Sequence, residues 1–246
     1  MNFINHTPFY PKNHEENMPF LEAILLFSVF FLPGYFQQEA GFNIDSMLNP
    51  GFHLFTLLFS LPQMLLIIYI INLRSNSDLR SYGIVPLRET PVLKVIVSYV
   101  FILSIPLLLG IIQQFIGVSE PVYKNTGIEI NSDFYIHLSE QPVLILFIAV
   151  TCLLVGYFEE LFFRVYLIRD FAVNRRAAHL TIIIGSLLFA AGHMYQGFTA
   201  AAGTFLIGVI LGYRYLAHSS WHEIALAHAL YNFTAILLLP AASGLA

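Results

Sequence analysis

The chain has 246 residues, of which 57% are hydrophobic and only 11% are charged, and its mean hydropathy is +0.73. A soluble domain carries about a quarter charged residues, so this composition excludes an ordinary soluble protein and indicates a polytopic membrane protein. The net charge of −4 comes without a basic stretch, which argues against a nucleic-acid partner. The single cysteine, Cys152, rules out an internal disulfide and a cysteine-based metal cluster.

The first eighteen residues are polar and lack the basic region and cleavage site of a secretory signal, so we expect an exposed tail at 1–18. Residues 19–246 are predicted to form a single transmembrane domain. A bilayer core requires about 20 mostly apolar residues per helix. Seven segments meet this requirement, namely Pro19–Phe36, Phe52–Asn72, Pro91–Ile116, Gln141–Ile168, His179–Met194, Ala200–Ala217 and Trp221–Leu239. The prediction is an all-α bundle of seven spans around a polar cavity, with an eighth re-entrant or interfacial segment left open.

The charges in the connections predict the orientation of the bundle. If alternate connections lie on opposite sides, nine Lys and Arg residues fall on one side and only Lys124 falls on the other. Positively charged connections stay on the cytoplasmic side, so we expect the amino terminus in the cytoplasm and, with seven spans, the carboxyl terminus outside. The longest outward connection, Ser119–Glu140, is either an ordered lid or a solvated connector, and the connector is favoured. We expect a multi-pass protein of the plasma (inner) membrane of a prokaryote.

Ionisable residues in spans cost about 2.5–3.5 kcal/mol each at the helix centre, so they usually face a protein interior or a wet cavity. Glu22, His53 and Lys94 lie near the predicted ends of the first three spans, where an interfacial position explains them. His222 and Glu223 lie beside a tryptophan and are also expected at the interface. The stretch His222–His228 is not a zinc-protease motif, because its histidines are six residues apart instead of four.

The fourth span carries Glu159, Glu160 and Arg164. Glu160 and Arg164 are i,i+4 neighbours with the acid on the amino-terminal side, which favours an ion pair. Glu159 is turned about 100° around the helix and lacks that partner. A carboxylate in such a place suits general base and acid chemistry, although a purely structural ion cluster explains this span about equally well.

The later spans each add a polar position. His228 and Asn232 are again i,i+4, so both side chains share one face of the seventh span. The pair can stabilise an oxyanion or clamp two helices together by hydrogen bonds. His193 follows a run of small residues near the end of the fifth span.

Three ordered motifs result, E-E-x-x-x-R at Glu159–Arg164, F-x-x-x-H at Phe189–His193 and H-x-x-x-N at His228–Asn232. This trio closely resembles the CPBP family, the CAAX proteases and bacteriocin-processing enzymes also called Abi proteins. The resemblance covers a catalytic core at about 142–240, and it implies an intramembrane endopeptidase with a helical bundle around a cavity.

The resemblance also implies a role for each motif residue. Glu159 is similar to the catalytic glutamate and His193 to its partner in activating water. His228 and Asn232 resemble the oxyanion-stabilising pair, and Glu160 with Arg164 resembles a supporting ion pair.

Two alternatives to this mechanism remain at the sequence level. In a zinc-dependent version of the protease, Glu159, His193 and His228 would be the metal ligands, which matches the number of protein ligands in a catalytic zinc site. The metal-free mechanism is favoured, because an asparagine four residues after His228 suits hydrogen bonding better than zinc ligation. From another class, a proton-linked carrier or a catalytically silent immunity or scaffold protein would use the same residues differently, although no internal repeat typical of carriers is visible. The expected partners are a peptide or protein substrate, with or without a lipid modification, and membrane lipids.

Overall fold

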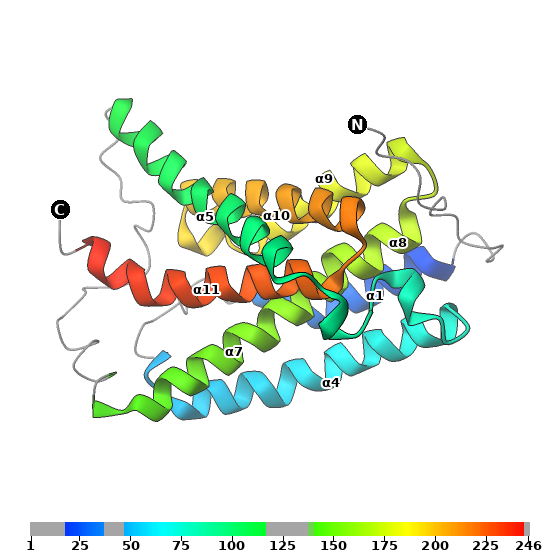
Figure 1. Ribbon diagram of the computed structural model, residues 1–246, viewed down its shortest axis with the longest axis horizontal. Coiled ribbons are helices and arrows are strands. Elements are labelled where there is room, and N and C mark those ends of the chain that lie inside the picture. The colour runs from blue at the N-terminus through cyan, green and yellow to red at the C-terminus, as the bar shows by residue number, and fades with distance from the viewer. Residues whose placement is uncertain (1–17, 37–46, 117–137, 139, 244–246) are drawn as a thin grey trace.

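The computed structural model describes residues 18–36, 47–116, 138 and 140–243, and this part of the chain contains helices and turns but no strand. The predicted all-α bundle is therefore confirmed (Figure 1). The expected tail at 1–18 lies almost entirely outside the described residues, as does the connection Ser119–Glu140.

Each of the seven predicted segments holds a helix. The first contains α1 (Met18–Phe30) and α2 (Leu32–Phe36), and the next two contain α4 (Pro50–Arg74) and α5 (Val92–Phe115). The fourth contains α7 (Pro142–Glu160), a π-helical segment η4 (Leu161–Tyr166) and α8 (Leu167–Phe171). The last three contain α9 (Arg175–Ala191), α10 (Phe198–His218) and α11 (Trp221–Ser243). Short 3₁₀ turns occur at η2 (Leu79–Tyr82), η3 (Leu87–Glu89) and η5 (Met194–Gln196).

Helix starts follow local chemistry. Asn49 caps α4 by accepting a hydrogen bond from Gly51 N, and Pro50 occupies the first turn, where its missing N–H costs nothing. Asn174 caps α9 in the same way through Ala177 N. The helix of the fifth predicted span, α9, therefore begins at Arg175, four residues before the predicted start, and it ends before His193.

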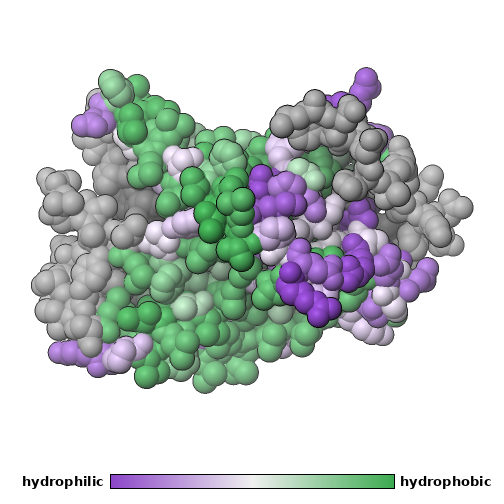
Figure 2. Space-filling model, in the orientation of Figure 1, coloured by the Kyte–Doolittle hydropathy of each residue, from purple (hydrophilic) through white to green (hydrophobic). Residues whose placement is uncertain are grey.

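The helices identify a multi-pass membrane protein. Within the described residues, four helical stretches are long and apolar enough to cross a bilayer, at Pro50–Arg74, Val92–Phe115, Pro142–Phe171 and Phe198–His218. The apolar part of α1 is shorter. Hydrophobic residues cover a broad surface in Figure 2, and the largest group of hydrophilic residues lies in its right half, with smaller groups at the left edge. The number of spans, seven or eight, stays a prediction.

Close packing between α7 and α11 positions the polar residues. α11 packs along both α7 and α5, while α4 lies against the other side of α7 and α10 packs on α9 (Figure 1). A Cβ on Gly156 would lie 2.9 Å from Ala229 N and 3.0 Å from Ala225 O, so glycine permits this close approach. The approach brings the turn that carries Glu159 and Glu160 opposite His228.

The fourth predicted span is not one regular α-helix. Directly after Glu160 the backbone widens into the π-helical turn η4, all six residues of which are buried. Such π-bulges are frequent at functional sites because they redirect side chains without ending the helix. The sequence pattern predicted a plain helix here, since a single wide turn leaves the hydrophobicity unchanged.

Two residues expected at the membrane interface, His53 and Glu22, have polar partners elsewhere in the bundle. The side chain of His53 is fully buried, with Nδ1 2.9 Å from Thr151 Oγ1 and Nε2 2.9 Å from Met47 O. Glu22 accepts hydrogen bonds from Arg74 (2.8 Å) and Tyr166 (2.6 Å). The interfacial assignment was wrong for His53 and incomplete for Glu22, because both have polar partners on other helices that sequence spacing does not show.

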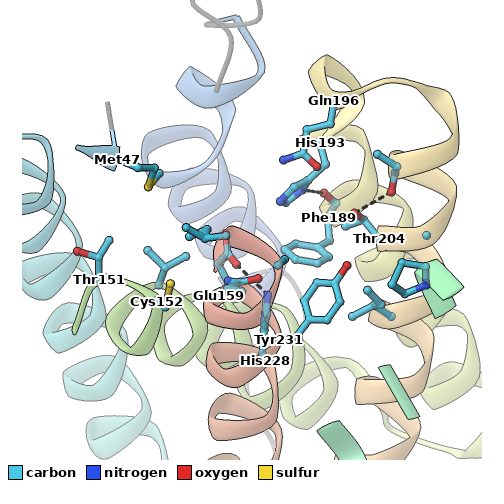
Figure 3. A pocket seen from close by; sticks show the side chains of 18 of the residues that line it. Met47, Thr151, Cys152, Glu159, Phe189, His193, Gln196, Thr204, His228 and Tyr231 are labelled. Carbon is cyan, nitrogen blue, oxygen red and sulfur yellow. Dashed lines mark hydrogen bonds and ion pairs between the residues drawn. The ribbon is translucent and has the colours of Figure 1, made fainter. Parts of the chain in front are cut away.

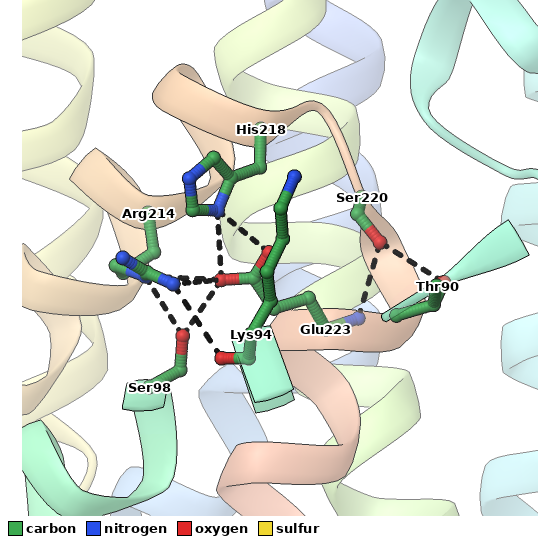
Figure 4. A network of polar contacts seen from close by, with 7 residues as sticks. All are labelled: Thr90, Lys94, Ser98, Arg214, His218, Ser220 and Glu223. Atoms are coloured by element: carbon green, nitrogen blue, oxygen red, sulfur yellow. Dashed lines mark hydrogen bonds and ion pairs between the residues drawn. The ribbon is translucent and has the colours of Figure 1, made fainter. Parts of the chain in front are cut away.

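Glu223 corrects the same kind of prediction. It was expected at the interface, but it is fully buried at the centre of a polar network between α5, α10 and the start of α11 (Figure 4). Its carboxylate accepts hydrogen bonds from Ser98 (2.7 Å), and it lies 2.7 Å from both Arg214 Nη2 and His218 Nδ1. The residue thus ties three helices together at one end of the bundle.

Candidate active site

Glu159, His193, His228 and Asn232 line one cavity of about 280 Å³. They come from three parts of the chain, namely the last turn of α7, the turn between α9 and α10, and the middle of α11. Figure 3 shows Glu159 near the middle of this cavity, with Thr151 and Cys152 on one side and His193 and Gln196 on the other. Residues separated by up to 73 positions in the sequence are thus brought to one site.

Glu159 and His228 face each other across the helix contact. Glu159 Oε2 lies 3.7 Å from His228 Nε2, and the two side chains are 18% and 4% exposed. The sequence predicted an unpaired Glu159, whereas the structure places an imidazole nitrogen beside it. Helical geometry within one span cannot show a partner that comes from another helix.

Glu160 holds His228 from the other side. Its Oε1 atom lies 2.7 Å from His228 Nδ1 and accepts a hydrogen bond from Arg164 Nη1 at 2.9 Å. The Glu160–Arg164 ion pair expected from the i,i+4 spacing is present, and both side chains are buried. The link to His228 was missed, and no signal in the sequence marks it.

The contact with Glu160 determines which ring nitrogen of His228 always carries a hydrogen. A carboxylate oxygen can only accept, so His228 carries its proton on Nδ1 and donates it to Glu160. The Nε2 atom therefore points toward Glu159 either as an acceptor, in neutral imidazole, or as a second donor, in imidazolium. Glu160 and Glu159 together place a carboxylate near each ring nitrogen.

His193 is oriented by its own backbone. Its Nδ1 atom lies 2.8 Å from Phe189 O, so Nδ1 donates and Nε2 is left free. The ring lies edge-to-face on Phe189, with centroids 4.8 Å apart, and Phe189 also touches His228 at 5.7 Å. The guanidinium of Arg164 lies 4.6 Å from the centre of the Phe189 ring. Phe189 therefore fixes the relative positions of both histidines and the buried ion pair.

The same region matches a known family. Residues 141–234 fit the family described as type II CAAX prenyl endopeptidase Rce1-like. This part of the chain, 94 of its 246 residues, is similar to the CAAX protease family. Comparison with curated proteins and with solved structures gave no match. Since this is a peptidase family, the match indicates a membrane endopeptidase.

The family match begins at α7 and ends within α11, so it contains all four cavity residues named by the motifs. The helices α1, α4 and α5 lie outside it. Two of them, α4 and α5, nevertheless help to form the cavity, because Phe52, His53 and Thr56 of α4 and Pro106 of α5 line it.

Two further residues of the cavity lie beside His193 and belong to no motif. Tyr195 packs on the His193 ring with centroids 6.3 Å apart, and its hydroxyl accepts a hydrogen bond from Gln196 at 3.0 Å. Burial raises the pKa of Tyr195, so the phenol stays neutral and retains its proton. Tyr195 and Gln196 lie two and three residues after His193 in the sequence. This short separation from the F-x-x-x-H motif could have identified them as candidate site residues.

In the zinc-dependent alternative, Glu159, His193 and His228 would be the ligands. Among the described residues, no group of three His, Cys, Asp or Glu side chains lies close enough together to hold a metal ion. His228 in addition uses Nδ1 to bind Glu160, which leaves only Nε2 for any other ligand.

Proposed function

We propose that this protein is a CAAX-protease-like endopeptidase that hydrolyses peptide bonds with a water molecule activated by Glu159 and His193. One observation carries the proposal, namely that both side chains line the same cavity as His228 and Asn232. A general base, a second acceptor for the water and two candidate oxyanion donors thus meet at one place.

The hydrogen bonding of His193 supports a role in aligning water. With Nδ1 committed to Phe189 O, neutral His193 offers the lone pair on Nε2. A water that donates one hydrogen to Nε2 and the other to the Glu159 carboxylate has its own lone pair free for attack on a carbonyl carbon. Glu159 accepts the proton in that step, as a general base.

His228 and Asn232 are suited to the opposite task. As imidazolium, His228 donates Nδ1–H to Glu160 and still has Nε2–H for an oxygen that gains negative charge. Asn232 lies one helical turn further along α11 and contributes an amide N–H. The tetrahedral intermediate then collapses when protonated Glu159 returns its proton to the leaving amine.

The proposed substrate is a peptide or protein segment that reaches the site from the membrane, with or without a lipid modification. The orientation with a cytoplasmic amino terminus, in a prokaryotic inner membrane, also remains a proposal, supported by the nine-to-one distribution of Lys and Arg between the two sides.

Cleavage of a peptide library by purified protein in detergent tests the proposal. Glu159→Gln should abolish cleavage, with a loss of about 10²–10⁴-fold, while Glu140→Gln, at an exposed position before α7, should leave the rate unchanged. Full cleavage by Glu159→Gln would overturn the mechanism. Loss of wild-type cleavage in chelator, restored by zinc, would favour the metal-dependent version, and solute uptake without cleavage would favour the carrier.

A further inference from the structure

The cavity extends well beyond the four proposed catalytic residues, along one face of α7. Ile148, Thr151, Cys152, Val155 and Glu159 all line it, at spacings of three and four residues. Figure 3 places Met47, Thr151 and Cys152 together on the side of Glu159 opposite to His193. We call this part, between α4 and α7, the α4–α7 arm.

The length of the arm suits a short extended peptide. Thr151 and Glu159 are eight residues apart on α7, which corresponds to about 12 Å at 1.5 Å per residue. An extended chain advances about 3.3 Å per residue, so three to four substrate residues fit between the reacting carbonyl and the end of the arm.

His53 and Thr151 are in contact in the wall of the arm, at the part most distant from His193. Met47 O can only accept, so His53 donates Nε2–H to it, and in the neutral ring Nδ1 then accepts the hydroxyl hydrogen of Thr151. Both polar hydrogens at this end are thereby used within the protein. Neither His53 nor Thr151 thus has a polar hydrogen left for a carboxylate.

The charge of the cavity lining also disfavours a negatively charged group of the substrate. The described lining contains the carboxylate of Glu159 and neither lysine nor arginine. Arg164 lies behind Phe189 and is not part of the lining. An acidic group in the arm would therefore be removed from water without a lysine or arginine to balance it, and the carboxylate of Glu159 would lie between it and His228.

We propose that the α4–α7 arm is a specificity subsite for an uncharged, extended segment of three to four residues on one side of the cleaved bond. It favours an internal stretch of a longer peptide and disfavours a free carboxyl terminus or an acidic side chain at those positions. This inference rests on the proposed function and adds the substrate class. His53, in α4, lies outside the matched family region.

The test uses internally quenched decapeptides with apolar residues around the cleaved bond, in detergent. Aspartate replaces asparagine at one position at a time, over four positions on each side, and kcat/KM is measured for each peptide. On one side of the bond, aspartate should lower kcat/KM at least about tenfold at consecutive positions, because an uncompensated charge is costly there. Peptides truncated on that side, if it is the carboxyl-terminal one, should be cleaved better as amides than as free acids.

Two pairs of variants locate the effect. Thr56→Lys adds a cation to the arm from α4 at a partly exposed position, and it should restore cleavage of the aspartate peptides about tenfold, whereas Thr56→Gln should not. Cys152→Phe should fill the arm and raise KM for long peptides more than it lowers kcat, while Leu153→Phe, at an exposed position on the same helix, should not.

Equal cleavage of aspartate and asparagine peptides at all eight positions would overturn the subsite. An equal increase of kcat/KM for all peptides in Thr56→Lys would also overturn the subsite. If Glu159→Gln is inactive in the same assays, the subsite alone has failed and the proposed function stands. If Glu159→Gln cleaves normally, the proposed function itself has failed.

Discussion

His228 Nδ1 and Glu160 Oε1 lie 2.7 Å apart, in a contact between α11 and α7 that joins the third sequence motif to the first. Because Glu160 also binds Arg164, the imidazole is held by a carboxylate that is itself held by a buried guanidinium. Glu160 is thus a positioning residue for His228, beyond the supporting ion pair that the sequence suggested.

Replacing Glu160 by glutamine tests this positioning. Gln keeps the size of the side chain and an acceptor for Nδ1–H, but it removes the charge that balances an imidazolium. We expect kcat to fall about 10–100-fold, the usual cost of losing a residue that orients a functional histidine, with little change in KM. The pH–rate profile of Glu160→Gln should also move, since the partner of a titrating ring has changed. An unaltered profile with a reduced rate would indicate a structural role alone.

Arg164 should matter more for stability than for the chemistry. It is 2% exposed, and Glu160 is its only hydrogen-bonding partner among the described residues. Arg164→Met removes one member of a buried ion pair, which should cost about 3–5 kcal/mol of unfolding free energy because a carboxylate is left behind. Thermal or denaturant unfolding in detergent measures this cost. The double variant Glu160→Gln with Arg164→Met should lose less stability than Arg164→Met alone, and an additive loss would contradict the assignment.

The close contact between α7 and α11 predicts a glycine effect. Gly156→Ala places a methyl group 2.9 Å from Ala229 N, a backbone atom that cannot move by itself. We expect a loss of about 1–3 kcal/mol in stability and a lower kcat, because α11 carries His228 away from Glu159. Gly110→Ala in α5 is the matched control, since a Cβ there meets nothing within 4 Å. Equal effects of both substitutions would show that the contact is looser than described.

A substitution of Glu223 should lower the stability of the protein and leave kcat almost unchanged, whereas Glu160→Gln should mainly lower kcat. Glu223→Gln leaves Arg214 and His218 without their buried carboxylate, so the unfolding temperature should fall clearly. The carboxylate lies outside the catalytic cavity lining, so the folded fraction should retain kcat within about twofold, as expected for an additive, distant site. Activity normalised to folded protein provides the measurement. A large loss of kcat at full stability would assign Glu223 a part in the reaction.

The sequence alone predicted the helices well, because long apolar runs and Asn or Pro at helix starts are local signals. It also selected the four residues that meet in the cavity, since charged and polar groups are conspicuous in apolar spans. It failed where two helices determine the outcome. The partners of His53, Glu223 and His228 lie outside the helix that carries each residue, and no spacing rule within one helix reveals them.

The wide turn at Leu161–Tyr166 determines how the residues after it are oriented relative to those before it. Asp170, just beyond it, binds Arg74 and accepts a hydrogen bond from Tyr82 at 2.6 Å. Shortening this turn by one residue would rotate everything after it by about 100° relative to Glu159. Asp170 would then point away from its partners while the carboxylates kept their place. The six buried residues of η4 therefore set the rotation between two parts of one continuous helical stretch. Glu159 can face the cavity while Asp170 binds Arg74 and Tyr82.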